Sequence, residues 1–189
     1  MLKIALDIRY RTESGASSYI KNIVPKLIKL NSNYEFVLIK FKDQFLKGTE
    51  DIDVIICPDL GIASQILWDQ FILPFRLKIA KVNMYHTLKM LGSFFSFCPQ
   101  IKVAHSITSP FRGEFPGSFS QRIYWIVLGN QLYKRSNHLI AVSEYVKDFL
   151  IEVLKVPQSK IDVVYNGIDP NFTQAQKKTQ AGSSRFIES

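Results

Sequence analysis

Short apolar runs alternate with longer segments of helical periodicity along most of this chain. Strand-like runs lie at residues 3–9, 35–41, 54–57, 82–85, 101–104 and 138–142. Helical patterns lie at residues 17–30, 68–79 and 119–135. Such alternation is typical of parallel strands, because each intervening helix returns the chain to the starting edge of the sheet. We therefore predict an α/β fold, a Rossmann-like open parallel sheet flanked by helices.

The last unit of this pattern begins at Ser143, which is suited to cap a helix. The apolar residues of that helix recur at helical spacing: Val146, Phe149, Leu150, Val153 and Leu154. Pro157 is expected to stop the helix, and residues 161–165 then read as a short buried strand. That strand leads into a turn at Asn166 and Gly167.

The length and composition of the chain fit one domain. A chain of 189 residues with 47% hydrophobic residues can bury one core of ordinary size but not two. We expect the folded domain to cover residues 1–169 and residues 170–189 to form a polar, disordered tail. Two cysteines in a chain without a secretory leader suggest neither a disulfide framework nor a metal site, so we expect a cytoplasmic protein.

The net charge of +8 suggests an anionic partner. Residues 68–114 carry six lysines and arginines against two acidic residues, and the same region holds Phe94, Phe95 and Phe97. Together these residues predict a surface that rests on anionic lipid headgroups, at the cytoplasmic face of a membrane. The alternative is that these phenylalanines belong to the core. A nucleic-acid partner is not expected, because no helix-turn-helix, RRM or zinc pattern is present.

Ligands of open parallel sheets lie beyond the carboxyl ends of the strands, so the residues after each strand are candidate site residues. After the first strand come Arg9, Arg11, Ser14 and Gly15, where a loop opens onto a helix N-terminus that favours a phosphate or carboxylate. One glycine is too few for a dinucleotide-binding or P-loop motif. The alternative is that Gly15 only permits the turn and Ser17 caps the helix.

Two histidines, His86 and His105, each follow a predicted strand. An imidazole in that position is able to donate a hydrogen bond to a phosphate oxygen or a sugar hydroxyl. We take His105 as the better candidate and His86 as a second substrate-binding residue. The alternative for both is a structural hydrogen bond at a strand end.

Five ordered segments of the chain resemble motifs of one protein family. They are residues 3–9, a first strand; Ser14-Gly15, a glycine turn; residues 68–74, which resemble "W-E-Q-x-x-L-P"; residues 102–107, which resemble "V-x-T-x-H-D-L"; and residues 143–169, which resemble the family's last helix and its "V-x-x-N-G-I/V-D" strand end. In this order they resemble the N-terminal, acceptor-side domain of a GT-B fold glycosyltransferase of the family 4 type.

The resemblance implies a retaining transfer of a hexose from a nucleotide sugar to a glycan or lipid-linked acceptor. The acceptor is held by this domain, the nucleotide sugar is a co-substrate held by a second domain, and no further cofactor is implied. His105 takes the position of the family's histidine near the donor sugar and is the candidate catalytic residue. Ser106 stands where the family has an aspartate and is a substrate-binding candidate. Asn166, Gly167 and Asp169 correspond to the hinge between the domains.

The family's donor domain is not recognisable in this sequence. Glu144 and Glu152 have the spacing of the glutamate pair that holds the nucleotide sugar, but both fall on the helix after Ser143, where we expect solvated charges. The resemblance therefore implies a truncated enzyme that is inactive alone, or a split enzyme whose donor half is a separate chain. The alternative is a non-catalytic basic Rossmann-like module that docks on a membrane surface or a partner protein. No Ser-His-Asp or Cys-His setting supports a hydrolase.

Overall fold

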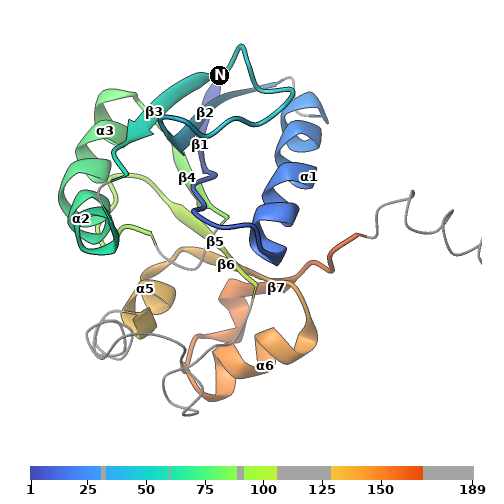
Figure 1. The fold of residues 1–189 in the computed structure, drawn as a ribbon. Helices are drawn as coiled ribbons and strands as arrows, with labels where there is room; N and C mark the ends of the chain where they lie inside the picture. Colours follow the sequence, from blue (N-terminus) through green and yellow to red (C-terminus); the bar gives the residue numbers. More distant parts are fainter. Residues whose placement is uncertain (31–32, 60, 89–91, 106–128, 168–189) are drawn as a thin grey trace, which may run out of the picture.

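The computed structural model describes residues 1–30, 33–59, 61–88, 92–105 and 129–167 (Figure 1). Its strands are β1 (Leu2–Asp7), β2 (Tyr34–Phe41), β3 (Asp53–Cys57), β4 (Met84–Thr87), β5 (Gln100–Ala104), β6 (His138–Ala141) and β7 (Ile161–Val163). Its helices are α1 (Gly15–Leu30), α2 (Ile62–Leu67), the π-helix η1 (Trp68–Ile72), α3 (Leu73–Ile79), α5 (Asn130–Arg135), α6 (Glu144–Glu152) and the 3-10 helix η4 (Gln158–Lys160).

The seven strands form one parallel sheet in the order β3-β2-β1-β4-β5-β6-β7. This confirms the predicted Rossmann-like α/β fold. The chain builds outward from β1 to β3 and then returns to place β4 on the other side of β1. Leu6 of β1 accordingly lies between Leu38 of β2 and His86 of β4. After β1 the chain continues toward β2, and after β4 it continues toward β5 on the other side of β1. The position between β1 and β4 is therefore a topological switch point, where open parallel sheets bind ligands.

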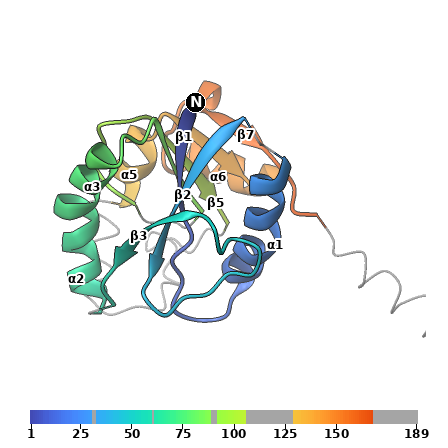
Figure 2. The same cartoon turned by 90° about the horizontal axis from the view of Figure 1, so that it is seen from above.

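Helices cover both faces of the sheet. Helix α1 lies on one face, and α2 and α3 lie on the other (Figures 1 and 2). The first face buries Leu6, Ile20 and Val24. The opposite face buries Leu77 and Tyr85. A third cluster holds α6 against the far strands: Ala104, Tyr133, Leu139, Ala141, Val146, Phe149, Leu150, Leu154, Val156 and Ile161.

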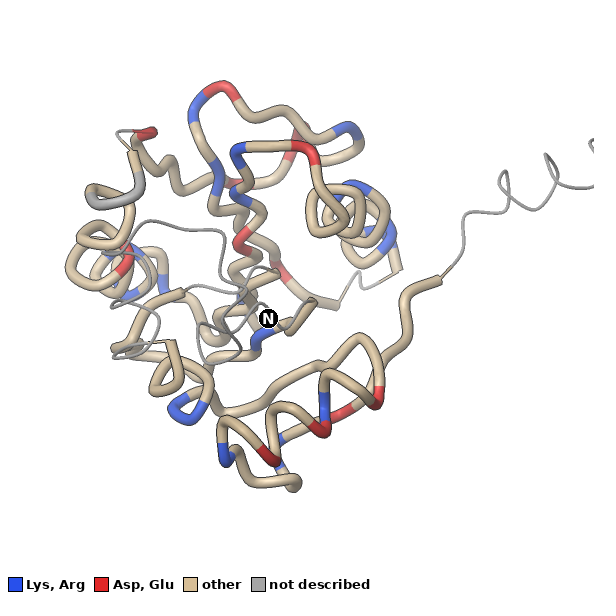
Figure 3. Tube along the Cα trace, turned by 60° about the horizontal axis from the view of Figure 1, so that its bottom comes forward, with Lys and Arg blue, Asp and Glu red and all other residues tan. Residues whose placement is uncertain are grey.

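Charged residues are unevenly distributed over these helices (Figure 3). Helix α1 carries lysines and no acidic residue, whereas α6 carries three acidic residues and Lys147. Glu144 and Glu152 of α6 are both exposed, and Glu144 pairs with Lys147 at 2.9 Å. They are solvated helix charges, as predicted.

Two of these helix boundaries differ from the sequence prediction. The helix expected to begin at Trp68 begins at Ile62 and passes through the π-helix η1, after which Pro74 is accommodated in the first turn of α3. Helix α6 is capped by Ser143, whose hydroxyl accepts from the Val146 amide, but it ends at Glu152 rather than at Pro157. Pro157 instead precedes the short helix η4.

The fourth strand also differs, because it begins at Met84 rather than at Val82. The amide of Val82 still bonds to the carbonyl of Leu77 at 3.0 Å, and Lys81 has a φ of 56°, so these residues close the end of α3. His86 consequently lies inside β4 and not after it. The helix expected at residues 119–135 falls mostly outside the described residues. Within the described ranges, no helix is long and apolar enough to cross a membrane.

Candidate functional site at the carboxyl ends of the strands

His105 follows β5 directly and lies against α1. Its Nε2 is 3.1 Å from the carbonyl oxygen of Leu88, and its ring meets the ring of Tyr19 edge to face with centroids 4.6 Å apart. Burial lowers the pKa of His105, and the bond to Leu88 only partly opposes that shift. The ring is therefore neutral at pH 7. Because a carbonyl only accepts, Nε2 carries the proton and Nδ1 is left as an acceptor.

The turn that begins α1 is held by reciprocal serine bonds. The Ser17 amide donates to the Ser14 hydroxyl at 3.3 Å, and the Ser14 amide donates to the Ser17 hydroxyl at 2.7 Å. Ser14 is thus the residue that caps the helix, so the alternative of a Ser17 cap is wrong. Glu13 also lies at this helix end, where it accepts from Ser17 at 3.1 Å and from Lys21 at 2.6 Å. An anion bound here would have to compete with the Glu13 carboxylate.

Gly15, the glycine of this turn, has no conformational need to be glycine. Its φ is not positive, and a Cβ built on it would meet nothing within 4 Å. The alternative that Gly15 only permits the turn is therefore wrong. A substrate-binding role for Ser14 and Gly15 stays a prediction.

The side chain of Arg9 lies in a buried polar network instead of projecting from the edge of the sheet. Its guanidinium donates to Asp7 Oδ2 at 2.7 Å and to Asp69 Oδ1 at 2.6 Å, and its Cζ lies 4.8 Å from the ring centroid of Trp68. The Tyr85 hydroxyl donates to Asp7 at 2.8 Å. Burial by itself would lower the pKa of Arg9, but Asp7 and Asp69 raise it well above the ordinary value. Arg9 is fully charged and fixed, and its direct contact with a ligand stays a prediction.

Arg11 lines an open pocket of about 700 Å³ next to the ends of β1, β2 and β3. It forms an ion pair with Asp59, bonds to Gln65 at 3.3 Å and lies 5.0 Å from the ring centroid of Phe41. The opposite wall is the loop after β2, where Phe45 is 67% exposed. Gln44 fixes this loop, because its side chain donates to the Ile8 carbonyl and accepts from the Phe41 amide.

A comparison of the sequence with known families decides what this domain is. The profile of Glycosyltransferase Family 4 matches residues 14–172. The chain belongs to glycosyltransferase family 4. One relative is O-antigen chain mannosyltransferase RfbU of Salmonella typhimurium, 33% identical over 95 residues that make up 50% of this chain and 24% of that protein.

Solved structures share the fold of this family 4 domain at low sequence identity. A glycosyltransferase from Rickettsia africae matches with a TM-score of 0.58 and 18% identity, over 100% of this chain and 50% of that chain. Anabaena Alr3699/HepE, in complex with UDP and glucose, matches with a TM-score of 0.59 and 17% identity, over 96% and 50%. The chain thus spans about half the length of these structures, which is consistent with the N-terminal domain of a GT-B glycosyltransferase.

The family 4 motif at residues 68–70 holds neighbouring segments of this domain together. Trp68 lies under the Arg9 guanidinium, Asp69 pairs with it, and Gln70 holds the chain that leads to β5. Gln70 donates to the Gly92 carbonyl at 3.1 Å and accepts from the Phe94 amide at 2.7 Å. All three residues lie on the π-helix, an irregularity often found at functional sites. The sequence motif therefore joins the end of β1 to the loop that precedes β5.

The remaining predicted site residues are separated. His86 lies inside β4, and its buried Nε2 has no hydrogen-bond partner among the described residues. Burial lowers the pKa of His86 to about 4. Asn166 and Gly167 are exposed after β7. Ser106 and Asp169 lie outside the described residues.

Several residues of the site escaped sequence reasoning. Tyr19 belongs to the apolar stripe of the first predicted helix and matches a tyrosine of the family's glycine turn, but its contact with His105 has no signal in the sequence. Gln44 and Phe45 belong to a loop without a family motif. Among the described residues, no three histidine, cysteine, aspartate or glutamate side chains are grouped to hold a metal ion.

Proposed function

We propose that this domain is the acceptor-binding half of a retaining glycosyltransferase that transfers a hexose from a nucleotide sugar to a glycan or lipid-linked acceptor. One observation carries the proposal: in a family 4 domain, His105 lies beside the switch point of the sheet, held by Leu88 and Tyr19. The similarity to a protein described as an O-antigen chain mannosyltransferase supports a polysaccharide acceptor. The similarity to a structure with bound UDP and glucose supports a nucleotide sugar donor.

His105 has the chemistry to recognise a sugar hydroxyl. A neutral imidazole that donates from Nε2 to Leu88 offers Nδ1 as an acceptor, so it suits a hydroxyl donor better than an anionic phosphate. The Arg11 pocket suits a sugar ring further along the acceptor. It combines an exposed aromatic ring, Phe45, with the fixed polar groups of Arg11 and Asp59. Because these side chains are already held in place, less conformational entropy is lost when a ligand binds.

We further propose that these 189 residues have little or no transferase activity alone. Catalysis requires groups that surround the leaving diphosphate in the transition state, and one side of a cleft cannot surround it. The donor half is then a second Rossmann unit. We place the reaction in the cytoplasm, as the absence of a recognisable disulfide framework among the two cysteines suggests.

Binding and transfer are tested on the purified chain with amide chemical shifts and a radiolabelled-sugar assay. Methyl α-D-mannopyranoside and mannobiose should shift the amides near His105 and Arg11, whereas GDP-mannose and UDP-glucose should shift them weakly and yield no transfer. His105→Ala should remove the shifts near Tyr19 and keep those near Phe45. Transfer by the isolated chain would refute its inactivity, and no response to any sugar would refute the acceptor role.

A further inference from the structure

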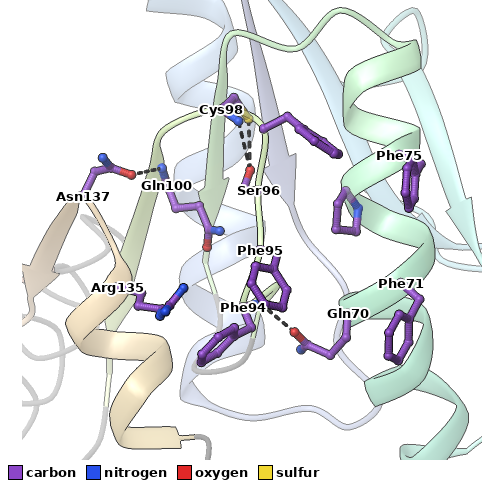
Figure 4. A pocket seen from close by; sticks show the side chains of 12 residues that line it. Gln70, Phe71, Phe75, Phe94, Phe95, Ser96, Cys98, Gln100, Arg135 and Asn137 are labelled. Atoms are coloured by element: carbon purple, nitrogen blue, oxygen red, sulfur yellow. Dashed lines mark hydrogen bonds between the residues drawn. The ribbon is translucent and has the colours of Figure 1, made fainter.

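A second groove lies between α3 and α5 and is lined by phenylalanines (Figure 4). Phe71 and Phe75 come from η1 and α3, and Phe94, Phe95 and Phe97 come from the segment before β5. The groove has a volume of about 560 Å³, and Arg135 and Asn137 close its other side. In the part of the chain that the structure describes, it shares no lining residue with the Arg11 pocket.

Most of these rings are uncovered. The exposed fractions of Phe71, Phe75, Phe95 and Phe97 are 66%, 59%, 62% and 59%. The alternative that the sequence left open, a core position, is therefore wrong for Phe95 and Phe97. Ile72 and Ile79 add exposed apolar surface on the same two helices. A contiguous apolar patch of this kind on a soluble domain marks an interaction surface.

The charges around the groove are positive. Arg135 Cζ lies 4.3 Å from the ring centroid of Phe94, and Lys78 Nζ lies 4.8 Å from that of Phe97. Arg76 is exposed on α3, between Phe75 and Lys78. Among the described residues, none of those that line the groove is acidic. The long cationic side chains rest on the rings and can extend toward an anionic phosphate without moving the backbone.

The backbone beneath the rings is held in place. Gln70 ties Gly92 and Phe94 to the π-helix, and the Asn137 side chain accepts from the Gln100 amide at 2.9 Å (Figure 4). Gln100 and Asn137 stand at the amino ends of β5 and β6, opposite the edge that carries His105. A large flat partner on this groove would leave the acceptor site open.

We propose that this groove is the surface with which the domain docks on a bilayer that contains anionic phospholipid. Exposed phenylalanines rimmed by arginine and lysine match the apolar interior and phosphate layer of a membrane interface. Charge decides against a second copy of this chain as the occupant, because two identical cationic rims would repel. The inference does not depend on the proposed transferase function, and it places that function next to a membrane-bound acceptor.

The test measures co-sedimentation of the purified chain with vesicles. Vesicles with phosphatidylglycerol should retain the chain, pure phosphatidylcholine should retain much less, and high salt should release it. Phe95→Ser with Phe97→Ser should lower retention about tenfold or more, since both rings lose their apolar contact with the bilayer. Phe45→Ser is the control for the loss of an exposed ring, because Phe45 is 67% exposed but lies in the Arg11 pocket.

The charge contribution is tested separately with Arg76→Gln and Lys78→Gln. Each lost cation should weaken binding about fivefold on anionic vesicles. The matched control is Lys26→Gln with Lys29→Gln, two cations of α1 on the opposite face of the sheet. Equal losses in the control pair, or no binding to anionic vesicles, would overturn the proposal. A dimer in sedimentation velocity that Phe95→Ser dissociates would assign the groove to a second copy instead.

Discussion

Arg9 Nη2 donates to Asp69 Oδ1 at 2.6 Å, and this buried ion pair joins the end of β1 to the π-helix. The next residue, Gln70, holds the chain before β5. A continuous chain of side-chain contacts therefore connects the loop of the proposed acceptor site with the groove lined by phenylalanines. The side chain of Arg9 and that of Asp7 are each 0% exposed, so the network lies wholly inside the domain.

Arg9→Met should destabilise the domain by about 3–5 kcal/mol, because it leaves two buried carboxylates without their shared cation. Urea denaturation followed by circular dichroism gives the free energy of unfolding. Lys147→Met is the matched control, since it removes a cation from a solvated pair with Glu144 and should change stability far less. Equal costs in the two variants would show that the buried network does not stabilise the fold.

Gln70→Ala should release the segment that leads into β5. The variant loses two hydrogen bonds, to the Gly92 carbonyl and from the Phe94 amide, and should lose about 1–2 kcal/mol of stability. Hydrogen exchange should quicken at the Phe94 amide and leave α6 unchanged. Gln131→Ala, an exposed substitution on α5, should change neither. Unchanged exchange at Phe94 would argue against the clamp.

His86 should make the domain less stable in mild acid. Its pKa is about 4 in the folded chain against an ordinary value of 6.5, so the unfolded chain binds the proton more tightly. Stability is then complete above pH 6.5 and falls as the pH drops toward 4, by up to about 3 kcal/mol.

His86→Leu should remove this pH dependence. It should also raise stability at pH 7 by about 1 kcal/mol, because it removes a buried Nε2 that has no hydrogen-bond partner among the described residues. Urea midpoints between pH 4.5 and pH 7.5 measure the effect. His138→Gln is the control and should keep the dependence, since His138 is a half-exposed histidine paired with Asp162. If both variants kept it, the acid sensitivity would arise elsewhere.

The periodicity of the sequence was sufficient to predict the sheet, because parallel strands and amphipathic helices leave strong patterns. It misplaced β4 because Val82 is as apolar as a strand residue but closes the end of α3. It placed the start of the α2–α3 segment too late, because α2 (Ile62–Leu67) begins after Gly61 without a side-chain cap that would mark its start. Both errors are local.

The candidate site was harder to predict than the fold. Position after a strand identified His105, which the structure places beside the switch point. The same rule selected Arg9, whose side chain turns back to Asp7 and Asp69. Nothing in a one-dimensional pattern tells an exposed arginine from one neutralised by a carboxylate sixty residues away. Phe71 and Phe75 lie within the helix predicted at residues 68–79, and nothing in its pattern singled them out as exposed.

The contact between Tyr19 and His105 gives a direct test of the site geometry in the isolated chain. Burial lowers the pKa of His105, and the Tyr19 ring, with centroids 4.6 Å apart, provides part of that burial. Tyr19→Ala should therefore raise the pKa of His105 toward its ordinary value of 6.5. An NMR titration of the imidazole protons measures the shift. Tyr145→Ala removes a tyrosine that is 62% exposed and should leave the His105 titration unchanged. A pKa that stays low in Tyr19→Ala would mean that other groups bury His105, and the proposed acceptor contact at Nδ1 would then face a more closed site than the structure indicates.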